Sequence, residues 1–201
     1  MRVHEWSNIV RALRRLHGLS RAQFASMIPV PADAVARWEE GQEVPAAPAQ
    51  AILRDMLSGH FHSHPTFLGI KAMVRATQQL SALYTPGMVV HALSRPLEGL
   101  FAEHRFDVLG TSMLPRIAGR SSEMVETYVL PMLEGRSDIL SLSFIDRGVA
   151  DRTLILRQQL TIIPLDGIRV LATVGIPLHR SDDPDLPDAD LRILTADDLR
   201  G

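Results

Sequence analysis

The 201-residue chain has no cysteine. It therefore has no disulfide, no thiolate metal site and no cysteine nucleophile, and no flavin can form a cysteine adduct on it. Lysine is also scarce, because Lys71 is the one lysine among 21 basic residues. Apolar residues make up 46% and charged residues 22%. This composition excludes global disorder and leaves room for one or two domains with proper cores.

No segment has the character of a leader or a membrane span. The start, Met1–Trp6, lacks an apolar stretch of signal-peptide length. Residues 76–94 carry no charge, yet they are too polar for a bilayer core. The polar or helix-breaking residues in that stretch include Gln78, Gln79, Pro86 and His91. We expect a cytoplasmic protein with no membrane contact.

The N-terminal part has the pattern of short packed helices. Apolar residues of the first two helices recur at helical spacing: Ile9, Leu13, Leu16, Phe24, Ala25 and Ile28. Gly18 is a typical residue just after a helix end. Ser20 followed by Gln23 fits a capping box, which places the start of the second helix there.

A proline-containing turn at 29–31 precedes a third helix over about 32–39. That helix is expected to pack Val35 and Trp38 inward. Residues 45–57 then predict one or two further helices, which completes a helical domain over residues 1–58.

Residues 18–41, from Gly-Leu-Ser-Arg-Ala-Gln-Phe to Trp-Glu-Glu-Gly, resemble the helix-turn-helix of the Cro/phage-repressor-like (XRE) transcription factors. The resemblance implies that a homodimer binds double-stranded DNA through the third helix. The positions it assigns to the DNA surface are Arg14, Arg15, Arg21, Ala32, Asp33, Ala36 and Arg37. Arg21 takes the phosphate-contacting place and Arg37 is the strong base reader. Because alanine cannot make bidentate hydrogen bonds to a base, a helix-turn-helix that binds another protein remains an alternative.

Ser58–Pro65 is the expected domain boundary, and Thr66–Tyr84 has the spacing of an amphipathic helix. Residues 59–84 are thus interpreted as a linker plus a helix. Three histidines alternate in it: His60, His62 and His64. In a strand they would share one face and could bind a metal, but Pro65 and the lack of a nearby carboxylate favour a flexible polar linker. We therefore expect no metal site.

From residue 85 the pattern changes to mixed helices and strands, which gives an α+β chain overall. The expected elements are a strand at Met88–Leu93, helices at 96–104, 112–118 and Glu123–Leu133, and strands at Ile139–Ile145, Thr153–Pro164 and Ile168–Ile176. This order, with Phe106–Met113 and Asp166–Thr173, resembles a PAS-type domain. The resemblance implies a sensor or dimerisation domain with an antiparallel sheet over residues 85–178. Residues 179–201 are expected to be an acidic, flexible tail.

Four aromatic residues of this domain are candidates for lining a ligand cavity: Phe101, Phe106, Tyr128 and Phe144. They could equally fill the core, so a small-molecule ligand remains a possibility that the sequence does not decide. His91 and His104 are interpreted as ordinary core or surface residues, because the long helix before the three strands has no histidine for a haem. We expect no cofactor.

Gly110–Pro115 resembles the Gly-x-Ser-Met-x-Pro signature of self-cleaving repressors, with Ser112 as the nucleophile. That chemistry needs a lysine base downstream, and the chain has none after Lys71. We therefore expect Ser112 to cap a helix and the chain to have no enzymatic activity. The sequence predicts a bacterial-type DNA-binding regulator, with a helix-turn-helix interaction protein as the alternative and a degenerate self-cleaving repressor as the less favoured one.

Overall fold

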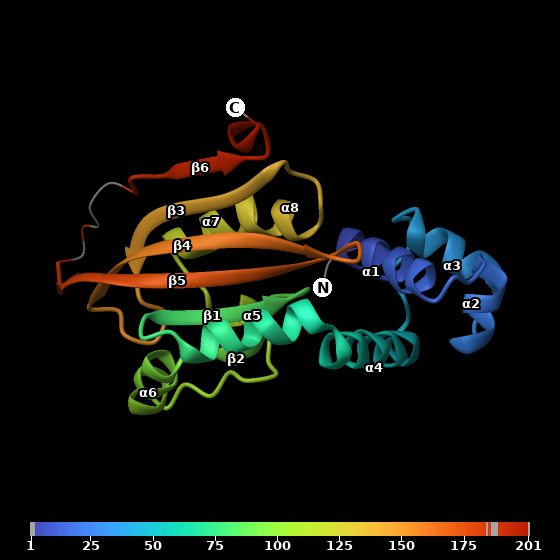
Figure 1. The fold of residues 1–201 in the computed structure, drawn as a ribbon, viewed down its shortest axis with the longest axis horizontal. Coiled ribbons are helices and arrows are strands. Elements are labelled where there is room, and N and C mark those ends of the chain that lie inside the picture. Colours follow the sequence, from blue (N-terminus) through green and yellow to red (C-terminus); the bar gives the residue numbers. More distant parts are fainter. Residues whose placement is uncertain (1–2, 184, 186–188, 201) are drawn as a thin grey trace. The chain divides into compact units, whose positions relative to one another are not determined.

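The computed structural model describes residues 3–183, 185 and 189–200 (Figure 1). The chain divides into two compact units. The N-terminal unit contains Met1–Gly69 and Pro164–Ile168, and the second contains Ile70–Ile163 and Arg169–Gly201. Within the described part, no helix combines the length and apolar character needed to cross a bilayer.

Among the described residues, four helices lie wholly within the N-terminal unit: α1 (Val3–Leu16), α2 (Arg21–Met27), α3 (Ala32–Glu39) and α4 (Ala47–Ser63). The predicted capping box starts α2. The backbone N–H of Gln23 donates to Ser20 Oγ at 3.2 Å, and Ser20 N–H donates back to Gln23 Oε1 at 2.9 Å. Gly18 ends α1 with a φ of 63°, a conformation that glycine adopts at little cost.

The core of this unit is formed by the apolar faces of all four helices. Its buried side chains include Trp6, Ile9, Leu13, Phe24, Ile28, Val35, Trp38, Leu53 and Phe61. The predicted inward positions are thus confirmed, except that Leu16 is 41% exposed. Leu16 is the last residue of α1, where the helix has no further turn to pack against.

The expectation of a flexible linker at 58–65 is wrong for residues 58–63, which form the last turns of α4. Pro65 does not disrupt this helix, because it is the first residue of α5 (Pro65–Ala76), where a missing N–H costs nothing. The expected helix over Thr66–Tyr84 is also too long, since its C-terminal part is strand β1 (Leu80–Thr85).

The second unit is built on a six-stranded sheet of order β2-β1-β5-β4-β3-β6. Its other strands are β2 (Val89–Leu93), β3 (Ile139–Arg147), β4 (Leu154–Leu165), β5 (Ile168–Arg180) and β6 (Arg192–Thr195). The pairs β1–β2, β1–β5, β3–β4 and β3–β6 are antiparallel. The α+β fold class and the four strands predicted after residue 85 are confirmed.

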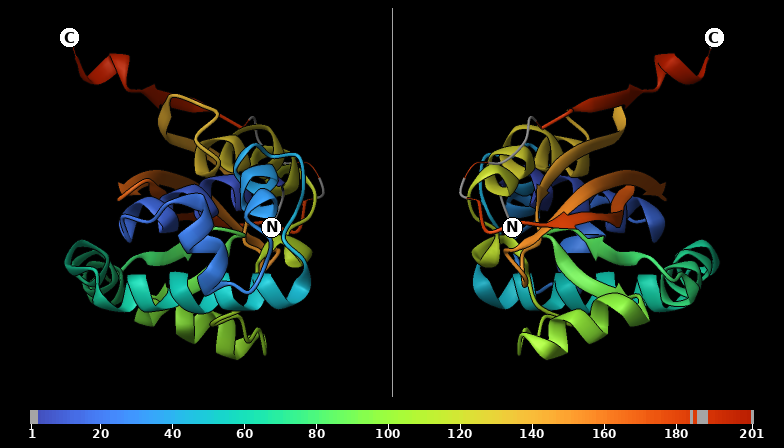
Figure 2. Two further views of the ribbon diagram at one scale, coloured as in Figure 1. Left: turned by 90° about the vertical axis from the view of Figure 1, so that its right-hand side faces the viewer. Right: turned by 90° about the vertical axis from the view of Figure 1, so that its left-hand side faces the viewer.

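The strand β6 was not expected. It pairs with β3 at one edge of the sheet, as Figure 2 shows for the red strand beside the gold one. The expected flexible tail is therefore wrong for Arg192–Thr195, although residues 184, 186–188 and 201 of that tail lie outside the described residues. A short helical turn, Asp197–Leu199, follows the strand.

Short helices of the second unit pack against the sheet. They are α6 (Arg95–Glu103), a 3-10 turn (Leu114–Arg116), α7 (Arg120–Met124), a π-helical turn (Val125–Val129) and α8 (Leu130–Leu133). Apolar residues of both layers form one core: Ala82, Val90, Phe101, Met113, Val129, Met132, Leu142, Phe144, Leu160 and Leu171 are among its members. The helices predicted at 96–104 and Glu123–Leu133 are thus present, whereas the one predicted at 112–118 is reduced to the three-residue turn Leu114–Arg116.

Candidate functional site

Two of the arginines assigned to DNA contacts, Arg14 and Arg21, bind one buried carboxylate, that of Glu39 at the end of α3. Its side chain is 2% exposed. Arg14 Nε lies 2.6 Å from Glu39 Oε1, and Arg21 Nε lies 2.7 Å from Glu39 Oε2. Ser7 and Arg11 both donate to the Glu39 backbone carbonyl. Glu39 thus joins α1, α2 and α3 through charge-assisted hydrogen bonds.

These contacts set the protonation state of Glu39. Burial acts to raise the pKa of its carboxyl, but the hydrogen bonds from Arg14 and Arg21 outweigh burial and lower that pKa. Glu39 therefore stays ionised near neutral pH. The same contacts raise the pKa of Arg21, mainly through its hydrogen bond with Glu39.

The remaining predicted DNA residues lie on α3. Ala32 and Asp33 are exposed in its first turn, while Ala36 and Arg37 are half-buried one turn later. Arg37 forms an ion pair with Asp33, and its Nε lies 2.7 Å from Glu43 Oε2. Arg21 also approaches the carboxylate of Glu40.

Three of the four predicted arginines thus form ion pairs within the unit. Arg14 pairs with Glu39, Arg21 pairs with Glu39 and Glu40, and Arg37 pairs with Asp33 and Glu43. Arg15 is exposed at the end of α1. Sequence reasoning missed the acidic partners. The i,i+4 spacing of Asp33 and Arg37 was a usable signal, but the long-range contacts of Glu39 had none.

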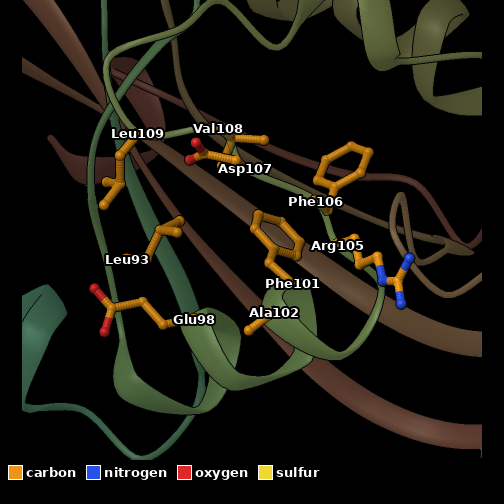
Figure 3. Close-up of a pocket in the computed structure, with 9 residues that line it drawn as sticks. All are labelled: Leu93, Glu98, Phe101, Ala102, Arg105, Phe106, Asp107, Val108 and Leu109. Atoms are coloured by element: carbon orange, nitrogen blue, oxygen red, sulfur yellow. The ribbon is translucent and has the colours of Figure 1, made fainter.

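The second unit has an open pocket of about 410 Å³ between α6 and the segment that follows it. Figure 3 shows its lining: Leu93, Glu98, Phe101, Ala102, Arg105, Phe106, Asp107, Val108 and Leu109. Phe101 and Phe106 form its aromatic wall, with ring centroids 5.1 Å apart in an edge-to-face arrangement. The walls are mainly apolar, and Glu98, Arg105 and Asp107 supply charges.

Two of the four aromatic residues predicted to line a cavity thus line this pocket. Tyr128 and Phe144 lie elsewhere, packed in the core between the helices and the sheet. A second space of about 60 Å³ lies beside Tyr84, Gln158 and Thr173. That volume is small against the roughly 300–1,000 Å³ of a typical ligand pocket. Burial raises the pKa of Tyr84 to about 12, so its hydroxyl stays protonated.

Ser112 is engaged in a turn. Its hydroxyl donates to the Gly87 carbonyl at 2.6 Å and accepts from the backbone N–H of Leu114 at 3.3 Å. The hydroxyl thus supports the start of the 3-10 turn at Leu114–Arg116, close to the capping role that the sequence predicts. Met113, and not Ser112, is the residue that directly precedes the turn.

The histidines fall into different settings. His91 lies on β2, and His104 is 40% exposed with its Nε2 3.9 Å from Asp151 Oδ2. His60 and His64 lie at the end of α4 beside Asp166, and these three residues could hold a metal ion. Burial, and then the neighbouring His64, lower the pKa of His60.

A comparison with solved structures matches 13 chains, of which two are described here. A PAS domain of an HTR-like protein from Haloarcula marismortui has 16% identity and a TM-score of 0.37, covering 56% of this chain and 92% of its own. A PAS domain from a two-component sensor histidine kinase has 9% identity and the same TM-score, covering 56% and 96%. No protein-family model and no curated protein matches the chain. The description of the second unit therefore rests on its own strand order and helices.

Proposed function

We propose that the chain is a DNA-binding transcriptional regulator of bacterial type that acts as a homodimer. The N-terminal unit would bind double-stranded DNA, and the PAS-like unit would act as a sensor or dimerisation domain. One observation carries the proposal: a short capped helix, α2, is followed after four residues by α3, whose first two residues, Ala32 and Asp33, are exposed. This is the geometry in which a second helix enters a major groove.

The proposed contacts follow from the positions of the side chains. Ala32 and Asp33 in the first turn of α3 and Arg37 one turn later would meet base edges. Arg21 begins α2, where the positive helix end favours phosphate. Two copies would place their α3 helices about 34–36 Å apart, one turn of DNA.

The test is fluorescence anisotropy with DNA from a random-sequence selection, repeated over a salt series. The variant Arg21→Ala/Arg37→Ala is compared with Arg95→Ala, which removes an exposed arginine from α6. We expect the double variant to bind more weakly and to reduce the salt slope by about 1–2, since each lost phosphate contact removes about 0.9. Equal binding by all three proteins would exclude this assignment. Sedimentation velocity tests the homodimer.

A second candidate function is favoured by the ion pairs. Arg14, Arg21 and Arg37 each have a carboxylate partner within the unit, so DNA phosphates would have to compete with those carboxylates. A helix-turn-helix of this charge suits a protein partner, as in an anti-regulator. Absence of salt-sensitive DNA binding by a folded wild-type protein would favour this second function.

The sensor role is proposed for the open pocket beside α6. Its size and its apolar walls suit a small molecule with an apolar body. Native mass spectrometry of the purified protein, with an absorption spectrum, tests for a bound molecule. Ala102→Trp would fill the pocket from the exposed side of α6 and should abolish retention of that molecule. A molecule held equally by this variant would place the ligand elsewhere.

A further inference from the structure

Three potential metal ligands meet in the N-terminal unit. His60 lies in the last turn of α4, His64 directly follows the helix, and Asp166 lies in the turn between β4 and β5, within the Pro164–Ile168 segment of the same unit. Their ligand atoms all lie within 4.8 Å of one another. His64 Nε2 is 3.1 Å from Asp166 Oδ2. The i,i+4 spacing of the histidines places both rings on one side of the helix end, with the ring centroids 5.1 Å apart.

One atom of this cluster has an unusual environment. His60 Nε2 is buried, and no hydrogen-bond partner lies within reach among the residues that the structure describes. Buried polar side-chain atoms are normally satisfied, so an orphaned ring nitrogen indicates a missing partner. The carboxylate of Asp166 and the ring of His64 share this position with His60, and the ring of His17 is also close enough to act on His60 electrostatically.

We propose that His60, His64 and Asp166 bind a divalent transition-metal ion, of which Zn²⁺ is the representative. Two imidazoles and one carboxylate form a known donor set for zinc, and a water molecule would complete the tetrahedron. At bond lengths of about 2.0–2.1 Å, ligand atoms lie about 3.4 Å apart, so no separation in the cluster has to shrink by more than about 1.4 Å. Rotation of the exposed Asp166 side chain, with small adjustments of the half-buried histidine rings, can supply this change.

Metal binding would alter one hydrogen bond at the start of α5. The backbone N–H of Phe67 donates to His64 Nδ1 at 3.3 Å, which leaves a ring proton on Nε2, facing Asp166. To bind a metal through Nε2, the ring must carry its proton on Nδ1 instead. The Phe67 N–H then loses this acceptor. The proposal thus couples metal occupancy to the first turn of α5.

His62 provides a matched control. It lies between the two proposed ligands, but its Nδ1 is 2.7 Å from the Ser58 carbonyl oxygen, and it is exposed. The experiment uses the full chain without a histidine tag, freed of metal by chelation. Zn²⁺ binding is measured by calorimetry, and Co²⁺ binding by its visible absorption. The variants are His60→Gln, His64→Gln, Asp166→Asn and His62→Gln.

We expect one ion per chain, with affinity at least about tenfold weaker in each of the three ligand variants and unchanged in His62→Gln. Absence of binding tighter than roughly 100 µM would overturn the proposal. Equal loss in His62→Gln would also overturn it, because it would indicate adventitious binding to surface histidines. Circular dichroism shows whether each variant folds. If His64→Gln unfolds, His60→Gln and Asp166→Asn decide the outcome.

Discussion

Glu39 shows how one buried side chain organises the N-terminal unit. It is the shared acceptor for Arg14 and Arg21, which come from two other helices. Removing the buried Glu39 carboxylate would leave the guanidinium groups of Arg14 and Arg21 without their ion-pair partner, which lowers the stability of the folded state. The Glu39→Gln variant should therefore lower the free energy of unfolding by roughly 2–4 kcal/mol at pH 7. Chemical denaturation followed by circular dichroism measures it.

The same residue makes stability depend on pH. The pKa of Glu39 is lowered in the folded state, so its contribution is fully present above its unfolded pKa of about 4.5 and is lost as pH falls through the lower folded value. We expect wild-type stability to decline below about pH 4.5, and the decline to be smaller in Glu39→Gln. Parallel declines in the two proteins would show that Glu39 does not control the acid response.

Position 148 has no room for a side chain, so it requires glycine. A Cβ added there would lie 2.6 Å from the backbone carbonyl oxygen of Asp151, so the turn between β3 and β4 would have to shift. Gly148→Ala should destabilise the second unit by about 1–3 kcal/mol. Gly99 in α6 is the matched control, because a Cβ there meets open space. Gly99→Ala should be neutral or stabilising by about 0.5–1 kcal/mol in the same thermal melts.

At the scale of elements, substitutions of Ser20 test whether the capping box stabilises the start of α2. Ser20→Ala removes the side-chain acceptor for Gln23 N–H and should cost about 0.5–2 kcal/mol. Ser20→Asp keeps an acceptor at the same position and adds a negative charge at the helix start, so it should retain most of the stability. Denaturant titration compares both with wild type. A loss in Ser20→Asp equal to that in Ser20→Ala would contradict the capping role.

Elements with local signals were predictable from the sequence. Ser20, Gln23 and Gly18 mark helix ends through contacts within a few residues, and these ends are confirmed. β1 was mistaken for helix because Leu80–Thr85 is buried on both faces, which removes the alternation that identifies a strand. β6 was missed because it is four residues long, largely exposed and preceded by a polar stretch.

The candidate site was predictable only in part, because the sequence carries signals for local structure but not for contacts between distant residues. The positions of Arg21 and Arg37 on their helices follow from local pattern. Their pairing with Glu39 and Glu43 does not, because those contacts depend on how the chain packs. His60 and Asp166 are separated by more than a hundred residues, so their meeting has no sequence signal either.

At the scale of the whole molecule, charge balance bears on the proposed function. The chain carries a formal net charge of −2, and Arg37 has two carboxylate partners of its own, Asp33 and Glu43. If Arg37 reads DNA, those carboxylates compete with the nucleic acid for its guanidinium. Replacing these carboxylates with amides should strengthen binding, because an amide keeps an oxygen that can accept from a base edge but no longer forms an ion pair with the guanidinium, whereas a general change in net charge should matter less.

The variant Asp33→Asn/Glu43→Gln tests this competition, and Glu103→Gln/Glu123→Gln is its control. Both change the net charge from −2 to 0, but the control changes exposed residues of the second unit. We expect the first variant to bind DNA about 3–10-fold more tightly, with a salt slope steeper by up to about 1.8, because each copy of the homodimer frees one cation that can neutralise a phosphate and each adds about 0.9. The control should show neither change. If both variants behave alike, net charge and not Arg37 governs DNA binding. If neither variant binds DNA, the protein-interaction function gains support, because DNA binding would then be absent even when Arg37 is released from its carboxylate partners.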